Sequence, residues 1–300
     1  MRRTIRARPQ VLKRGSVARR GVLPQIPITL RVAVDPVEAE HVITRFLTDY
    51  LASSGRKAYV VGLSGGIDSA VSAALAARAV GPEKVHALIL PEKSTEKSHL
   101  DDAALVAKTI GIETQTLSIQ PIVDGFEKAY AKPDRAQLAN AKARARMILL
   151  HAEAFRRQGL VLGTGNKSEI LLGYFSKNGD GGVDVQPLGD LYKTHVRELA
   201  RHLRLPERVI TKPPTAGLWA GQTDEDELGI DYARLDRILL GFEIKLPFDV
   251  IANVVGVRVA EVERLDRMRV HSQHKRRMPL IPKLGLRSVG VDWRSPTWEG

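Results

Sequence analysis

The sequence predicts an α/β fold, a doubly wound and mainly parallel sheet with helices on both faces, followed by a helical C-terminal part. Short apolar segments alternate with longer segments whose apolar residues recur at helical spacing, which is typical of parallel sheets. Glycine turns follow the first and the last strand segments, at the sheet edge where such folds bind ligands. From Tyr232 to Arg277 the spacing indicates helices alone.

Charge divides the chain into a leader and a body. The 300 residues carry a net charge of +12, and residues 1–34 hold nine Lys and Arg side chains and no acid, so only three net positive charges belong to the rest. We expect residues 1–34 to be a basic, disordered leader and residues 35–300 to form one domain. A phosphate- or nucleic-acid-binding arm and an Arg-rich targeting peptide are the other interpretations of the leader.

The body begins after Asp35-Pro36. Apolar positions at helical spacing predict a helix over 37–53, and the apolar run at 57–63 is the first predicted strand. A glycine loop leads from it into a helix of small residues at 68–80. Strand, loop and helix in this order form the first repeating unit of a parallel sheet.

The remaining elements continue the alternation. They are, in chain order, a strand at 85–90 stopped by Pro91, a helix at 97–110 capped by Gly111, a strand at 114–119, a basic helix at 135–157, a strand at 160–162 and a helix at 193–203 ended by Pro206.

Two long segments are predicted to be loops. Residues 178–190 are rich in Gly and Asp, and residues 212–227 contain Pro213-Pro214; a loop of the latter length is often a functional lid. No apolar run approaches the ~18 residues of a membrane-spanning helix. The chain has no cysteine, which excludes thiolate chemistry and fits a reducing compartment, so we expect a cytoplasmic protein.

The loop Ser64-Gly65-Gly66-Ile67-Asp68-Ser69 has the chemistry of a phosphate site. Its glycines let the backbone approach a ligand, and the following helix N-terminus favours an anion. Asp68 would repel a phosphate unless a cation lies between them, which indicates Mg²⁺. The alternative is a plain strand-to-helix turn capped by Asp68 and Ser69. The loop is neither a Walker A nor a dinucleotide motif.

This Ser-Gly-Gly-x-Asp-Ser pattern resembles the signature of the ATP pyrophosphatases. That superfamily, with a Rossmann-like sheet, cleaves ATP to AMP and pyrophosphate and activates a carbonyl oxygen as an adenylate. The signature does not choose among members such as GMP synthetase, asparagine synthetase and NAD synthetase.

Downstream segments resemble the NAD synthetase family in order and spacing over roughly residues 35–285. They are Gly163-Thr164-Gly165-Asn166-Lys167-Ser168-Glu169, the run from Gly173 to Asp184, Pro187-Leu188, Leu191-Tyr192-Lys193, Pro213-Pro214-Thr215-Ala216-Gly217-Leu218, Thr223-Asp224-Glu225, Glu227-Leu228-Gly229, Tyr232 and His274-Lys275-Arg276-Arg277.

The resemblance implies an amidation. The family converts deamido-NAD, ATP and a nitrogen source into NAD, AMP and pyrophosphate, with Mg²⁺, as a homodimer whose dinucleotide site lies near the interface. Glutamine-dependent members carry an added amidase domain with a cysteine nucleophile. This chain has no cysteine, so we expect it to use free ammonia or ammonia delivered by a separate protein.

The resemblance also assigns an ATP and metal site. The implied Mg²⁺ carboxylates are Asp68 and Glu169, after strands expected to be neighbours, and Lys193 is expected to neutralise the departing pyrophosphate. Alternatively, Glu169 is an ordinary first-turn acid and Lys193 a solvated side chain. The implied ATP contacts are Gly62, Leu63, Ser64, Gly65, Gly66, Ile67, Asp68, Ser69, Thr164, Lys193 and Thr215.

The dinucleotide contacts implied by the resemblance are Arg144, Lys177, Asp184, His274 and Lys275. Arg144 and Arg146 are two residues apart on a helix, so they point to different sides. We expect one of them to bind ligand and the other to have a structural role. Asp184 is also our candidate base for the incoming ammonium. For the others, a solvated loop or helix end is the alternative.

The sequence leaves two other functions open. In the first, the same fold serves a different acceptor, as in a tRNA- or nucleotide-modifying ATP pyrophosphatase, for which the basic leader is the best support. A nucleic-acid-binding protein on an inactive scaffold is the other, and the intact loop with its two acids argues against it. Nucleic acid and membrane are therefore not expected partners.

Overall fold

A computed structural model describes residues 30–215, 217, 221 and 223–289. Its sheet has four parallel strands in the order β3-β2-β1-β4. The strands are β1 (Tyr59–Gly62), β2 (Val85–Ile89), β3 (Glu113–Thr116) and β4 (Leu160–Leu162). Along the chain, β2 is added beside β1 and β3 beside β2, and β4 is then added on the other side of β1. The strand order therefore reverses between β1 and β4, and in folds of this kind the ligand crevice lies at the carboxyl ends of the strands at such a switch point.

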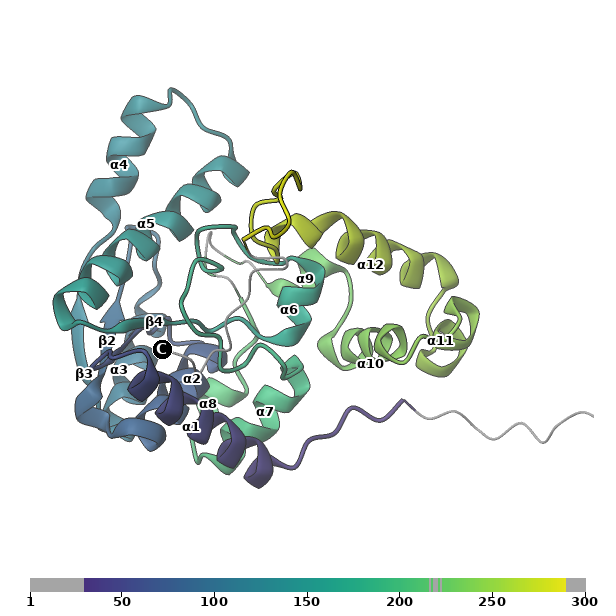
Figure 1. Cartoon of the computed structure of the whole chain (residues 1–300), viewed down its shortest axis with the longest axis horizontal. Coiled ribbons are helices and arrows are strands. Elements are labelled where there is room, and N and C mark those ends of the chain that lie inside the picture. The colour runs from purple at the N-terminus through teal and green to yellow at the C-terminus, as the bar shows by residue number, and fades with distance from the viewer. Residues whose placement is uncertain (1–29, 216, 218–220, 222, 290–300) are drawn as a thin grey trace, which may run out of the picture.

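Helices cover both faces of the sheet, as predicted (Figure 1). Successive side chains of β1 alternate between the two faces, so Tyr59 and Val61 join one core and Val60 joins the other. The first core packs against α1 (Pro36–Ser53), α2 (Ile67–Val80), α3 (Lys97–Ile110) and α7 (Lys193–His202), and the second against α4 (Gln120–Ala129) and α5 (Arg135–Arg157).

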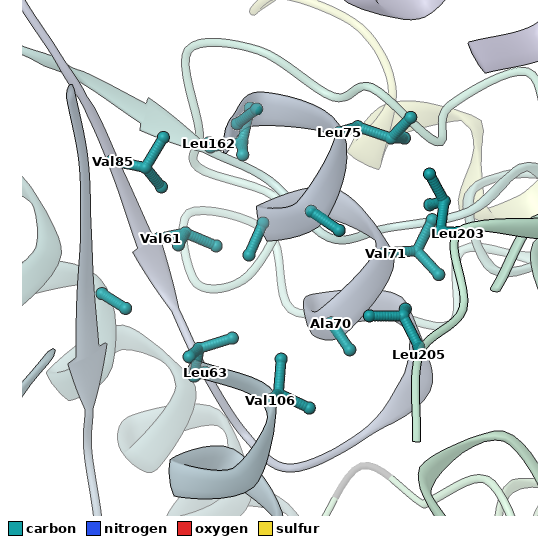
Figure 2. Packing of buried hydrophobic residues seen from close by; sticks show 14 of the residues in the cluster. Val61, Leu63, Ala70, Val71, Leu75, Val85, Val106, Leu162, Leu203 and Leu205 are labelled. Carbon is teal, nitrogen blue, oxygen red and sulfur yellow. The ribbon is translucent and has the colours of Figure 1, made fainter. Parts of the chain in front are cut away.

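The small-residue helix α2 lies at the centre of the first core. Figure 2 shows Ala70, Val71 and Leu75 of α2 packed among side chains from the sheet and from the end of α7. Alanine and serine fill most of its remaining buried positions. This lack of bulk lets α2 lie close to the sheet, which brings the loop before it to the crevice.

The C-terminal part is helical and has a core of its own. Its elements are α9 (Asp224–Leu228), α10 (Tyr232–Glu243), α11 (Phe248–Val255), α12 (Val259–His271) and the 3₁₀ helix η2 (Ser272–Lys275). Leu172 of α6 (Lys167–Leu172) and Tyr192 join this core. So does Leu30, which we had placed in the leader and which is 3% exposed; residues 1–29 lie outside the described residues.

Three local expectations need adjustment. The predicted loop 212–227 ends early, because Thr223 caps α9 with its side chain. Helix α4, which carries Pro121 in its first turn, was not predicted. Two short elements, η1 (Pro82–Lys84) and α8 (Glu207–Ile210), were also missed. Within the described part of the chain, no helix is long and apolar enough to cross a membrane.

Candidate active site

The phosphate loop turns sharply between β1 and α2. Gly65 has φ +77°, and a Cβ there would collide with the backbone oxygen of His99 on α3. Only glycine allows this turn and this close packing at once. The loop is therefore held rigidly against α3 before any ligand binds.

The serines organise the loop from within, and they leave the helix end open. The hydroxyls of Ser64 and Ser69 lie 3.1 Å apart, and Ser64 Oγ accepts from the backbone N–H of Gly66. No side chain caps α2 at Gly66. The N–H groups of its first turn thus keep their capacity for an anion, and the alternative of a turn capped by Asp68 and Ser69 is wrong.

The loop after β4 meets the phosphate loop across the crevice. Strands β1 and β4 are hydrogen-bonded neighbours, as expected. Asn166 caps α6 in a capping box with Glu169 and donates from Nδ2 to Asp68 Oδ1 at 3.0 Å. Glu169 is thus the first-turn helix acid of the alternative interpretation, and it also lies 3.4 Å from Lys193 Nζ; its role as a Mg²⁺ ligand stays a prediction.

Lys193 lies between the two predicted metal carboxylates. Its Nζ pairs with Asp68 and lies 3.4 Å from Glu169 Oε1. Its side chain is only 2% exposed, so the alternative of a solvated lysine is wrong. In the free chain, this ammonium occupies the space between two acids where a cation is expected.

The pKa values of this cluster follow from burial and charge. Burial opposes the charge of Lys193, yet Asp68, Glu169 and Asp224 raise the pKa of Lys193 above its ordinary value. Burial raises the pKa of Glu169 to about 8, against the pull of Lys193. Buried charged groups with shifted pKa values are typical of active sites, so this cluster is a candidate catalytic site.

A buried network positions the start of α7. Ser168 Oγ donates to Asp236 Oδ1 at 2.5 Å and accepts from the backbone N–H of Lys193. Asp236 also accepts from the N–H of Thr194 at 2.9 Å. A lysine at a helix N-terminus is electrostatically unfavourable, and the acids around it offset this cost.

Asp224 is a crevice residue that sequence reasoning did not assign. It is 3% exposed, and its carboxylate accepts from the hydroxyls of Tyr174 and Tyr232. The ring of Tyr232 lies under the Lys193 ammonium, 5.2 Å from its centroid. A signal was present, because both residues belong to segments that resemble the family, but it did not specify contact with Lys193.

Arg144 lies against the backbone of Lys177, and contacts of both residues with a ligand stay predictions. Arg144 donates to the backbone oxygen of Lys177 at 3.0 Å and to Asn140 on its own helix. Asp184 lies beside β4, where its Oδ2 accepts from the backbone N–H of Val161 at 2.7 Å. Its role as a ligand contact or base stays a prediction.

The basic segment His274 to Arg277 contacts the end of α6 and the residues after it. Lys275 Nζ donates to the backbone oxygens of Gly173 and Phe175. Arg276 donates to the backbone oxygens of Ile170 and Leu171 at the end of the same helix. These contacts support a structural role, and ligand contacts by His274 and Lys275 stay predictions.

The two predicted ATP threonines lie in loops beside the crevice. Thr164 follows β4 and is partly buried. Thr215 accepts at its hydroxyl from the N–H of Gly217. Neither position tests a contact with ATP.

The acids fit a magnesium ion that is shared with phosphate. Asp68 and Glu169 supply carboxylate oxygens from neighbouring loops at one crevice edge. The described residues contain no group of three or more His, Cys, Asp and Glu suited to a metal. Mg²⁺ commonly takes one or two protein carboxylates and completes its shell with phosphate oxygens and water, so this pair suits it.

Fold and site together define a class: an α/β enzyme of the ATP pyrophosphatase type, with its phosphate loop, two acids and a lysine at the switch point of the sheet. Comparison with known proteins narrows the class. The family model described as NAD synthase matches residues 40–279. The chain belongs to the NAD synthase family.

Proteins of known name and solved structures are similar to this chain over most of its length. The chain is 48% identical to the NH₃-dependent NAD⁺ synthetase of Thermococcus kodakarensis over 84% of this chain and 99% of that one. It is 46% identical to the enzyme of the same name from Sulfolobus acidocaldarius, over 87% and 94%. Among solved structures, NMN synthetase from Francisella tularensis matches with a TM-score of 0.75 and 36% identity, covering 84% of this chain and all of that one. NH₃-dependent NAD synthetase from Campylobacter jejuni matches with a TM-score of 0.72 and 31% identity, over the same shares.

Proposed function

We propose that this chain amidates deamido-NAD with ammonia to give NAD, consuming ATP and releasing AMP and pyrophosphate through an acyl-adenylate. The observation that carries the proposal is the crevice between β1 and β4. There an open helix N-terminus, two carboxylates and a buried lysine converge. That set suits the activation of a carboxylate by ATP, and the NH₃-dependent NAD⁺ synthetases among the relatives support ammonia as the nitrogen source.

The chemistry follows from charge. The nicotinate carboxylate does not react with ammonia, because its leaving group would be oxide. A carboxylate oxygen attacks the α-phosphorus of ATP, and pyrophosphate leaves. Ammonia then attacks the carbonyl carbon, the nitrogen loses a proton, and AMP leaves with the former carboxylate oxygen. No covalent enzyme nucleophile is required.

The ATP half of the site is proposed as follows. Bound Mg²⁺, held by Asp68 and Glu169, would neutralise charge on the phosphates. Lys193 stabilises the departing pyrophosphate, and Gly62 to Ser69 wrap the phosphates with backbone N–H groups and hydroxyls. Thr164 and Thr215 complete the ATP contacts from the two flanking loops.

The proposed contacts with deamido-NAD are supported by where their residues lie. Arg144 and Lys177 meet on one side of the crevice loops, and Lys275 lies against Gly173 and Phe175. With His274 and Asp184 they form the proposed deamido-NAD contacts. Asp184 is the proposed base for the incoming ammonium.

We also propose a homodimer, with the dinucleotide near its interface. The outer faces of α4 and α5 form a groove of apolar side chains that includes Phe126, Tyr130 and Ile148. Tyr130 and Ile148 are 53% and 57% exposed. Arg144 lines the same groove, so a partner docked there would lie beside a proposed ligand contact. A cytoplasmic location is likewise proposed.

A product assay tests the reaction. Incubation with deamido-NAD, ATP, Mg²⁺ and ammonium should give NAD and AMP one-to-one, and glutamine should not replace ammonium. The mononucleotide acid should be tested in parallel, because one structural relative is an NMN synthetase. Release of ADP, or AMP formation that depends on tRNA, would refute the proposal.

A further inference from the structure

Two cations on one face of α5 meet the segment that follows β2. Lys142 and Arg146 are four residues apart, which places them on the same side of the helix. Lys142 Nζ forms a buried ion pair with Glu92 at 2.8 Å, and Arg146 Nε donates to the backbone oxygen of Leu90 at 3.3 Å. Arg144 projects elsewhere, toward Asn140 and the loop of Lys177.

This segment lies beside the phosphate loop. The N–H of Leu63 donates to the backbone oxygen of Leu88 at 2.9 Å, so the chain two residues further on, at Leu90, runs level with the start of that loop at Ser64. Arg146 is thereby anchored at the carboxyl end of β2, one strand away from the acids and Lys193. It therefore lies at the sheet edge where the proposed function places ATP and its acceptor.

Arg146 has unused hydrogen-bonding capacity in this position. It is partly buried, and in the described part of the chain its two Nη atoms have no hydrogen-bond partner. The acids whose charges raise the pKa of Arg146 are Glu92 and Asp180. Glu92 is already paired with Lys142, and Asp180 Oδ1 accepts from the N–H of Ser176 at 2.8 Å.

Glu92 is the acid of this region. Its side chain is buried, and among the described residues its Oε2 has no hydrogen-bond partner. Burial lowers the pKa of Arg146, and the opposing charges of Glu92 and Asp180 do not cancel this effect. The two Nη atoms of this partly buried guanidinium are therefore available as donors to an anion.

We infer that Arg146 contacts substrate and holds the nicotinate carboxylate of deamido-NAD, an inference that rests on the proposed function. The ATP phosphates already have the phosphate loop and Lys193 across β1. The remaining anion that must reach the α-phosphorus is the acceptor carboxylate, and a planar guanidinium matches its geometry. One carboxylate oxygen stays available for attack while the other is held.

The inference predicts discrimination between substrate and product. The reaction converts a carboxylate into a neutral amide, so a guanidinium contact favours deamido-NAD over NAD. The readout is the ratio of the Kd for NAD to the Kd for deamido-NAD. General loosening of the site weakens both ligands together and leaves this ratio unchanged.

The test compares Arg146→Gln with Arg156→Gln, which removes the same charge from an exposed position on the same helix. Calorimetric titration should show deamido-NAD binding weakened by about tenfold or more in Arg146→Gln, with NAD and ATP within about twofold of the wild type. Arg156→Gln should match the wild type for all three ligands. Arg146→Met, which keeps an apolar stem for packing, is the second variant and should lose the same preference.

Other outcomes overturn the inference. Equal weakening of NAD and deamido-NAD would make Arg146 a brace for Leu90, and weaker ATP binding would assign it to phosphate. A wild-type ratio in either folded variant would also contradict it. A wild-type chain that does not convert deamido-NAD would instead refute the proposed function, so the two failures are distinguishable.

Discussion

At the scale of single residues, the central feature is the ammonium of Lys193 between Asp68 and Glu169. The same two carboxylates are the proposed Mg²⁺ ligands. If Mg²⁺ were held by Asp68 and Glu169, it would compete with Lys193 for these carboxylates. In the proposed role, the charge of Lys193 would then be available to stabilise the departing pyrophosphate.

Substitution of Asp68 tests this arrangement. Asp68→Asn should lower the rate of AMP formation by at least about a hundredfold, and higher Mg²⁺ should not restore it. Thermal unfolding without ligands should show a modest loss of stability, because Lys193 is 2% exposed and loses a partner. Asp49→Asn, in an exposed pair with Arg45, is the control and should change neither quantity. Activity that returns at high Mg²⁺ would count against the metal role.

Gly65 offers a second test at this scale. Gly65→Ala should destabilise the fold by about 1–3 kcal/mol from backbone strain, with a further loss because its Cβ meets His99 O, and should weaken ATP binding. Gly55 has a similar φ of +64° with open space around it, so Gly55→Ala carries the strain alone and should spare ATP binding. Equal unfolding free energies for the two variants would show that close packing at Gly65 is unimportant.

The sequence predicted which acids meet but not the side chains that hold them. Asp68 and Glu169 follow strands whose adjacency could be inferred, because parallel strands share a carboxyl edge. The contacts of Asp236 with Ser168 and of Asp224 with Tyr174 join residues far apart in the chain. No local pattern encodes such pairs, since they depend on how the C-terminal helices pack against α6 and α7.

At the scale of elements, α3 connects the phosphate loop with the segment before residue 215. His99 packs against Gly65. One turn later, Asp102 forms ion pairs with Arg208 of α8 and with Lys212. Burial alone would raise the pKa of Asp102, but the hydrogen bonds and charges of Lys212 and Arg208 outweigh it and lower that pKa.

The ion pairs of Asp102 with Arg208 and Lys212 should make the free energy of unfolding depend on pH. Because the folded-state pKa of Asp102 is lowered, its contribution is complete above the unfolded value of about 4 and is lost as pH falls through the folded value. Asp102→Asn should lower the free energy of unfolding by about 1–3 kcal/mol at pH 7, with a smaller difference below pH 4. Denaturant unfolding at both pH values measures it, and a difference that does not change with pH would contradict the account.

Element prediction succeeded where local signals agreed with packing. Gly111 ends α3 in the left-handed conformation, and the segments of β1, β2 and β4 were found because they are mostly apolar and buried. The strand predicted at 114–119 is β3, but β3 begins at Glu113 and already ends at Thr116, because its residues are all exposed and carry no apolar pattern that marks its bounds. Element prediction also missed α4, whose single fully buried residue leaves a weak pattern.

At the scale of the whole molecule, the groove on α4 and α5 is the proposed dimer surface. Ile148→Glu places a charge in this apolar groove and should shift sedimentation from dimer to monomer. Because Arg144 lines the groove, deamido-NAD binding should weaken along with dimerisation. Val42→Glu, at a similarly exposed apolar position on α1, is the control and should remain dimeric. A monomeric wild type would contradict the proposed homodimer.

The central claim is that the crevice between β1 and β4 joins a carboxylate oxygen to the α-phosphorus of ATP. Deamido-NAD labelled with ¹⁸O in its nicotinate carboxylate tests it directly, with mass spectrometry of the products after a single turnover with ATP, Mg²⁺ and ammonium. The account predicts one ¹⁸O in the phosphate of AMP and one retained in the amide of NAD. Label in pyrophosphate or inorganic phosphate, or AMP without label, would contradict it.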